Sequence, residues 1–247
     1  RHLENLTGGV LWDRIGDTGP RFEIAELHPH SLLRFTLQAG RPACEPVSEH
    51  PVESGIVVEE PTFRVRAVTL DHGTPVLAYA FEPAQSIKIR KERLAEMALA
   101  EGPWLTELKR RIRAGEIDGV IHLPDGSKKP IRALAEALVR AVAGEKLVYA
   151  TDFADTDDNR ARLVGLAKNA HTFFCEASFI EADADQAART GHLTTHACGE
   201  IAAAADVLHL VPFHFSRRYA KTPQVVYEEI ADVCSRVVMP KPGAFGV

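Results

Sequence analysis

The stretch "VLHLVPFHFSRRY" (residues 207–219) is an apolar run that ends in an imidazole and a cluster of hydrogen-bond donors. Val207 to Phe213 has the length and composition of a buried strand, and His214 stands where that strand should end. Two explanations fit this pattern. The polar residues pack there by accident, or the strand exists in part to place them in a site.

The segments before this strand repeat its pattern. Two further apolar runs, "KLVYAT" and "HTFFCEAS", predict strands that end at Asp152 and near Glu176. Helical spacing follows each run, in "DDNRARLVGLAKNA" and "TTHACGEIAAAA". Strands that alternate with helices indicate βαβ units around a largely buried sheet. The sequence therefore predicts the α/β fold class.

The ends of these helices carry the usual signals. Asp157 and Asp158 suit the N-terminal cap of the first helix, and Thr194 or Thr195 suits that of the second. A last helix, "TPQVVYEEIADVCSRV", has Pro223 in its first turn.

The first half of the chain has a different pattern. "PTFRVRAVTL" and "PVLAYAFEP" alternate with a period of two residues on either side of Asp71-His72-Gly73, which predicts two neighbouring strands of an antiparallel region. Residues 84–146 then look like an insertion. From Lys88 to Arg113 this insertion has eight basic residues against four acidic ones, in a chain of formal net charge -5.

The totals bound the class of protein. A chain of 247 residues, 45% hydrophobic and 26% charged, has an ordinary globular composition. Its net negative charge argues against a general coat of positive charge for nucleic acid but leaves room for a local basic patch. Four cysteines without a CxxC pair indicate thiols of a reducing cytoplasm. No apolar run reaches the roughly 18 to 20 residues of a membrane span, so no membrane partner is expected.

Three polar residues share one placement in this pattern. His72, Asp152 and His214 each stand at or just past the C-terminal end of a predicted strand, and such ends meet at one edge of a layered fold. Two imidazoles and a carboxylate suit zinc or a similar ion, and a carboxylate can bridge two ions. Each residue alone also has a purely structural explanation, as a hydrogen-bonded histidine or as part of an acidic loop. The three together favour a metal site.

A second group follows the same logic. Glu176 ends a strand and His192 precedes a helix, so the pair could form a proton relay in which the carboxylate stabilises an imidazolium. The alternative for His192 is a neighbour of the helix cap without a chemical role. Arg218 and Tyr219 follow His214 closely and could bind a phosphate group.

The order of several segments resembles ribonuclease Z and its relatives in the metallo-β-lactamase superfamily. The segments are "LDHGTPVLAYAF", "GPWLTELKRRIRAGE", "VYATDFADT", "FFCEASF", "GHLTTHACGEIA" and "HFSRRY". The resemblance implies a single αβ/βα-sandwich domain over residues 1–247. It also implies that the insertion at about 84–146 is the flexible arm with which this family holds transfer RNA.

The resemblance further implies a function and its residues. The family cleaves precursor tRNA on the 3′ side with two zinc ions, although His and carboxylate ligands also suit manganese or iron. His72 resembles the ligand of one metal, His214 that of the other, and Asp152 the bridging carboxylate. Glu176 and His192 resemble the pair that protonates the leaving 3′ oxygen. The candidate tRNA-binding residues of the arm are Lys88, Arg90, Lys91, Lys109, Arg110 and Arg111. A cytoplasmic homodimer is the family expectation.

One departure from the family is large. The motif HxHxDH, which supplies most metal ligands in this family, is absent, and "HLENLTGGVLWDRI" (2–15) resembles the helix that follows it. We therefore expect an N-terminally incomplete domain whose three remaining ligands bind metal weakly and support little catalysis. Two alternatives stay open: a hydrolase of a small phosphodiester or ester with the same fold, and an inactive fragment that binds RNA or dimerises.

Overall fold

The computed structural model describes residues 19–38, 44–84, 86–142 and 144–239, so the segment 2–15 lies outside the described residues. The chain divides into two compact units. Pro83–Glu145 forms one of them, here called the inserted unit. The described residues on either side, 19–82 and 146–239, belong to the other, here called the sheet unit.

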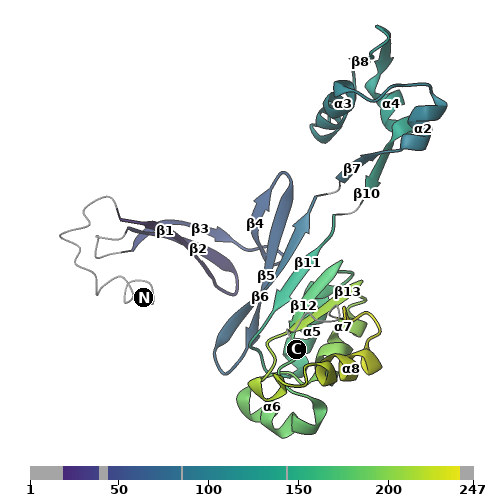
Figure 1. Ribbon diagram of the computed structural model, residues 1–247. Coiled ribbons are helices and arrows are strands. Elements are labelled where there is room, and N and C mark those ends of the chain that lie inside the picture. Colours follow the sequence, from purple (N-terminus) through teal and green to yellow (C-terminus); the bar gives the residue numbers. More distant parts are fainter. Residues whose placement is uncertain (1–18, 39–43, 85, 143, 240–247) are drawn as a thin grey trace. The chain divides into compact units, whose positions relative to one another are not determined.

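A six-stranded mixed sheet organises the sheet unit (Figure 1). Its strands, in spatial order, are β13 (His209–Phe213), β12 (Thr172–Glu176), β11 (Leu147–Ala150), β6 (Pro75–Pro83), β5 (Phe63–Asp71) and β4 (Ile56–Glu60). β11, β12 and β13 pair in parallel, whereas β11 pairs antiparallel with β6, and β4 with β5. The predicted α/β class is confirmed.

Helices supply the connections that parallel strands require. α5 (Asp157–Ala167) connects β11 to β12, and α6 (Ala184–Thr190) and α7 (Thr195–Ala204) lie between β12 and β13. α5 contacts β5 and β11, and α7 contacts β12, β13 and α8 (Gln224–Val233). No helix in the described part of the chain is long and apolar enough to cross a membrane.

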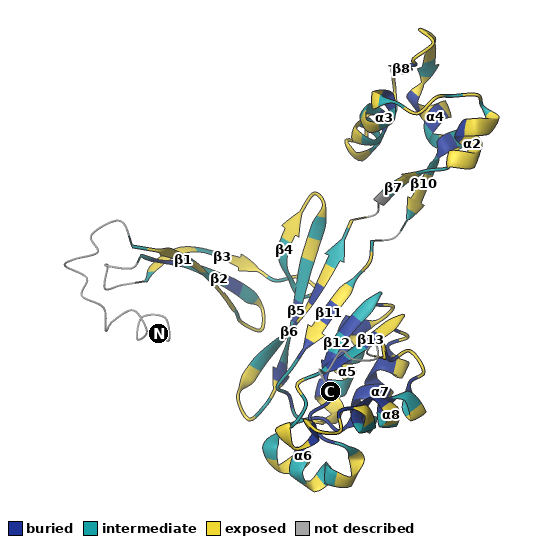
Figure 2. Cartoon of the chain, viewed as in Figure 1, coloured by how far each residue is buried: buried dark blue, intermediate teal, exposed yellow. Residues whose placement is uncertain are grey.

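The core of the sheet unit lies between the sheet and these helices (Figure 2). Phe173 on β12, Leu163 on α5 and Ile201 on α7 are essentially fully buried there. Burial of each such side chain contributes about 1.5–3 kcal/mol to stability. The well-packed core therefore holds in place the strand ends that carry polar residues.

The opposite face of the sheet has less cover than the sequence predicts. Along β6 and β11, small or apolar side chains that point to the helices are buried, and the alternate side chains are exposed. The exposed set is Tyr79, Phe81, Leu147 and Tyr149, with exposed fractions of 39–46%. Only one face of this part of the sheet is buried within the described residues.

The helix starts correct two predictions. The cap of α5 is Thr156, because its backbone is extended and its hydroxyl accepts a hydrogen bond from the Asn159 amide. Asp157 and Asp158 instead occupy the first turn, where their charges face the positive end of the helix dipole. Pro223 is the N-cap residue of α8 and does not lie in its first turn. For α7 the cap is Thr194, one of the two alternatives.

A separate three-stranded antiparallel sheet comes from the first described residues. It consists of β1 (Arg21–Leu27), β2 (Ser31–Gln38) and β3 (Glu45–Pro51), in that order.

The inserted unit has a core of its own. Its elements are β7 (Ser86–Ile89), α2 (Lys91–Glu96), α3 (Pro103–Arg113), β8 (Val120–His122), β9 (Lys128–Pro130), α4 (Ile131–Leu138) and β10 (Val139–Val142). β7 pairs with β10, and β8 with β9. Trp104 and Leu108 of α3 and Leu134 of α4 are buried in one apolar cluster. The insertion is therefore a small folded body between its two connections to the sheet unit.

Candidate active site

Three strands end in the predicted metal ligands. His72 follows β5 directly, Asp152 comes two residues after β11, and His214 follows β13 directly. The Nε2 atom of His214 lies 3.2 Å from Oδ1 of Asp152, and both side chains are about 40% exposed. The folded chain therefore places an imidazole and a carboxylate from strands far apart in sequence side by side at an accessible edge.

His72, Asp152 and His192 form a group that could hold a metal ion. One ligand atom from each of the three lies within 4.8 Å of the others. The His192 ring also lies between two histidines, with centroids 4.9 Å from His72 and 5.3 Å from His214. All four side chains thus share one site, and its donor set of imidazole nitrogens and a carboxylate oxygen fits a divalent transition-metal ion.

The orientation of His72 suits a ligand. Its Nδ1 atom lies 2.8 Å from the carbonyl oxygen of Gly191. Because a carbonyl only accepts, Nδ1 carries the proton and the lone pair is on Nε2. Such a hydrogen bond from the non-ligating nitrogen is the usual support of a metal-binding histidine.

Gly191 provides that carbonyl at a position where a side chain does not fit. It ends α6 in the left-handed region, with φ of 72°, and a Cβ atom would lie 3.0 Å from Nδ1 of His72. Sequence reasoning missed this glycine. The available signal was its place directly before His192, at the end of a helical segment.

Glu176 and His192 form the predicted pair. Nδ1 of His192 lies 2.9 Å from Oε2 of Glu176, whose side chain is fully buried at the end of β12. Oε1 of Glu176 accepts a hydrogen bond of 2.8 Å from the amide of Phe153, the residue after Asp152. Because the Glu176 carboxylate only accepts hydrogen bonds, the proton of His192 lies on Nδ1. Nε2 of His192 is then the nitrogen available on the side of the other histidines.

Two of the site residues have an unusual backbone. Asp152 and His214 are in the left-handed region, with φ of 56° and 61°, which costs a residue with a side chain about 1–2 kcal/mol. Such conformations persist where surrounding contacts determine them, and they gather at functional sites. The surrounding structure therefore determines the conformation of the polar residues at these strand ends.

Arg218 and Tyr219, the predicted phosphate-binding residues, lie in a short 3-10 helix, η4 (Arg217–Tyr219). The Tyr219 hydroxyl donates to Asp183 and accepts from the Ile180 amide, while Arg218 forms an ion pair of 2.7 Å with Asp183. The hydrogen bond from Tyr219 and the ion pair with Arg218 keep the pKa of Asp183 below its usual range. Both predicted residues thus already have partners, and their role toward phosphate stays a prediction.

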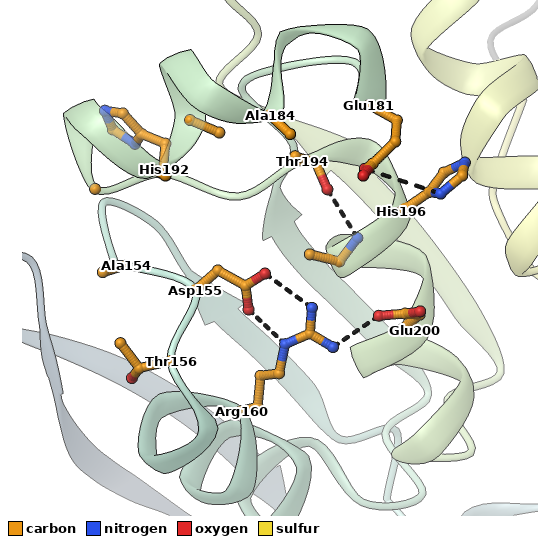
Figure 3. Close-up of a pocket in the computed structure, with 14 residues that line it drawn as sticks. Ala154, Asp155, Thr156, Arg160, Glu181, Ala184, His192, Thr194, His196 and Glu200 are labelled. Atoms are coloured by element: carbon orange, nitrogen blue, oxygen red, sulfur yellow. Dashed lines mark hydrogen bonds and ion pairs between the residues drawn. The ribbon is translucent and has the colours of Figure 1, made fainter.

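A pocket of about 450 Å³ borders His192 (Figure 3). Alanines from α6 and α7 leave the space, Glu181 of η3 (Glu181–Asp183) borders it, and Arg160 of α5 lies across it. Arg160 hydrogen-bonds both Asp155 and Glu200, and these bonds raise the guanidinium pKa. Because the carboxylates occupy its in-plane N–H groups, Arg160 is a structural link between α5 and α7.

The predicted tRNA-binding residues all lie in the inserted unit. Lys88 is on β7, Arg90 and Lys91 are at the start of α2, and the other three, Lys109, Arg110 and Arg111, are on α3. Glu107 pairs with Arg110 and Arg111, and their hydrogen bonds lower its pKa to about 2. Part of the positive charge on α3 is therefore neutralised within the helix.

Comparison with curated proteins identifies relatives along most of the chain. This chain is 37% identical over 221 residues to the ribonuclease Z of Deinococcus radiodurans. The matched segment makes up 89% of this chain and 64% of that protein. The ribonuclease Z of Natronomonas pharaonis is 32% identical over 197 residues, or 78% of this chain and 59% of that protein. The chain therefore spans less than two thirds of the length of these relatives. No family model matches the sequence.

Solved structures with some likeness include the metallo-β-lactamase fold protein YhfI of Bacillus subtilis and the short form of human tRNase Z. The first has a TM-score of 0.42 and 16% identity over 74% of this chain and 48% of that chain. The second has a TM-score of 0.38 and 17% identity over 66% of this chain and 40% of that chain. Both scores are too low to support an argument, so the assignment rests on the sequence relatives. These confirm the resemblance noted from the motifs: over most of its length, this chain is similar to ribonuclease Z.

Proposed function

We propose that this chain belongs to a metal-dependent endoribonuclease that cleaves precursor tRNA on its 3′ side. The observation that carries the proposal is the buried carboxylate of Glu176, hydrogen-bonded to His192, whose ring centroid lies 4.9 Å from that of His72 and 5.3 Å from that of His214. A proton donor next to a metal site is the arrangement that hydrolysis of a phosphodiester requires.

His72, Asp152 and His214 would hold the metal, with Asp152 between the two histidines. We favour zinc, because nitrogen and carboxylate ligands suit it, although manganese or iron would accept the same set. When bound, divalent ions would activate water and stabilise the charge that develops on the phosphate. Compared with the three-ligand set expected from the sequence, His192 adds a fourth donor nearby, but its role in the proposal is a different one.

His192 would act as the general acid. As water adds to phosphorus and loses a proton to the solvent, the bond from phosphorus to the 3′ oxygen would break, and Nε2 of His192 would give its proton to that oxygen. The leaving RNA then ends in a 3′ hydroxyl, and the other product keeps the phosphate. The Glu176 carboxylate would stabilise the imidazolium before the transfer and hold the ring in place throughout it.

The inserted unit supports RNA as the substrate over a small ester. It has twelve basic residues against nine acidic ones, and the rest of the chain has 17 against 25. A folded body with excess positive charge, attached to an otherwise negative chain, suits a ligand with a phosphate backbone. We assign Lys88 and Lys109 to that contact first, since Lys91 is paired with Glu101, and Arg110 and Arg111 are paired with Glu107.

We further propose a cytoplasmic protein that works as a homodimer. Three of its four cysteines, Cys175, Cys198 and Cys234, are buried free thiols, which suits a reducing compartment. The dimer follows from the family resemblance alone, and sedimentation of the natural protein that contains this sequence tests it.

The deciding experiment uses that natural protein with two substrates. Precursor tRNA and a chromogenic phosphodiester are each incubated with and without a chelator. We expect chelator-sensitive cleavage of the tRNA at one position 3′ of the acceptor stem. Cleavage of the small ester alone would support the rival hydrolase, and RNA binding without cleavage would support the inactive fragment.

A further inference from the structure

Two backbone hydrogen bonds and one side chain tie the loop of His214 to the segment that follows β12. The amide of Ala177 donates to the carbonyl of Phe213 (3.0 Å), and the amide of Ser216 donates to the carbonyl of Ser178 (2.9 Å). These bonds bracket His214 on both sides. The left-handed conformation of His214 is thus imposed by the segment that follows Glu176.

Ser178 stands at the centre of this arrangement. Its side chain is buried, with 3% exposed. Its Oγ atom lies 2.8 Å from Oε2 of Glu176 and 2.8 Å from the carbonyl oxygen of His214. A hydroxyl has one proton to donate, so a single donor faces two acceptors that would otherwise repel each other.

The other oxygen of Glu176 extends the same network to the second left-handed residue. Oε1 accepts from the amide of Phe153, which fixes the peptide that follows Asp152. The buried Glu176 carboxylate therefore accepts hydrogen bonds from His192 and from the amide that follows Asp152. Ser178 connects the same carboxylate to the carbonyl of His214. Among the described residues, no buried side-chain nitrogen or oxygen lacks a hydrogen-bond partner, and this includes the side chains of Glu176 and Ser178.

We propose that Ser178 is a positioning residue, whose hydroxyl couples the carboxylate that orients His192 to the backbone that presents His214. The inference rests on the proposed function for its catalytic meaning. The structural role of Ser178 does not depend on that function. Without its hydroxyl, the Glu176 carboxylate and the His214 carbonyl would face each other with no proton between them. The loop would then leave the geometry that brings His214 to Asp152.

Replacement of Ser178 by Ala, Cys and Thr tests this coupling. Alanine removes the donor, cysteine keeps the size but donates weakly, and threonine keeps the hydroxyl. The matched control is Thr195→Ala, which also removes a buried hydroxyl bonded to a carboxylate, that of Glu229, but lies outside the network. Crystal structures of the metal-free variants and titration with Co²⁺ provide two readouts.

We expect Ser178→Ala and Ser178→Cys to weaken Co²⁺ binding about 10–100-fold and to alter the visible spectrum of the bound ion. In the metal-free crystals His214 should leave its left-handed conformation. Ser178→Thr and Thr195→Ala should resemble the wild type in both readouts. If Ser178→Ala does not fold, Ser178→Cys decides the question alone.

The proposal is wrong if His214 keeps its conformation and Co²⁺ affinity is unchanged without the Ser178 hydroxyl. It is also wrong if Thr195→Ala weakens Co²⁺ binding equally, because the effect would then be general destabilisation. A wild-type chain that binds no Co²⁺ would contradict the proposed function. In that case the metal-free structures still decide the role of Ser178.

Discussion

The two units of the chain use polar residues in opposite ways. In the sheet unit, polar side chains such as Asn159, Glu176 and Ser178 are buried and hydrogen-bonded next to the candidate site. In the described part of the inserted unit, the buried side chains are apolar, and charge lies on the surface. Buried polar networks fix geometry at a cost in desolvation, whereas surface charge attracts ligands at long range. The comparison suggests that the sheet unit performs the chemistry and the inserted unit attracts the substrate.

The largest expected effect comes from removal of the proton donor in the sheet unit. His192→Ala should lower the turnover of precursor tRNA by about 10²–10⁴-fold, the usual contribution of a general acid. The metal content, measured by mass spectrometry of the ion, should stay the same. Loss of metal together with turnover would instead make His192 a ligand, as its distance to His72 and Asp152 also allows.

Removal of the inserted unit should separate binding from chemistry. Pro83 ends β6 and Leu147 begins β11, its antiparallel neighbour, so a short Gly-Ser linker can replace residues 84–145. We expect precursor tRNA binding to weaken at least about tenfold at low salt and to become less dependent on salt. Hydrolysis of a small phosphodiester should persist. Equal loss of both activities would contradict the division of labour between the units.

A pair of glycines, one in each unit, isolates the contact with His72. Gly191 and Gly115 have the same φ of 72°, but a Cβ atom would meet His72 at Gly191 and nothing within 4 Å at Gly115. Both Gly191→Ala and Gly115→Ala should lose about 1–2 kcal/mol of folding free energy through backbone strain. Only Gly191→Ala should also weaken metal binding, by about tenfold or more. Calorimetry with and without metal measures both effects, and equal metal affinity in the two variants would remove His72 from the site.

The smallest effect concerns an ion-pair cluster around Glu82, within the sheet unit. Burial opposes ionisation of Glu82, but the hydrogen bond from Arg64 and the charges of Lys146 and Arg66 outweigh it and hold its pKa below the usual value. A lowered folded-state pKa adds stability above the ordinary pKa of about 4.3, and this stability is lost as the pH falls below it. Glu82→Gln should therefore lower the free energy of unfolding, measured in urea, by about 0.5–1 kcal/mol near pH 7 and by progressively less in acid, since the Arg64 partner is half exposed. A cost that does not change between pH 7 and pH 3 would contradict this assignment.

Much of the sheet unit could be predicted from its sequence. Period-two and period-3.6 patterns locate β5, β6 and the alternation from β11 to α8, and the residues that end these strands are the ones that meet. What the sequence could not give is contact between segments distant in the chain. The place of Ser178 between Glu176 and His214, and that of Gly191 against His72, depend on the packing of α6 and β12 against loops far away. The cap at Thr156 was missed for a local reason, because aspartate and threonine are both good caps.

The roles of the site residues are most directly tested by anomalous X-ray diffraction from crystals of this chain grown with zinc. The account predicts a zinc peak among the side chains of His72, Asp152 and His214, with Nδ1 of His192 still on Glu176 and its Nε2 free of the ion. A zinc peak bound through Nε2 of His192, or no peak at this edge of the sheet, would contradict the assignment of ligands and proton donor.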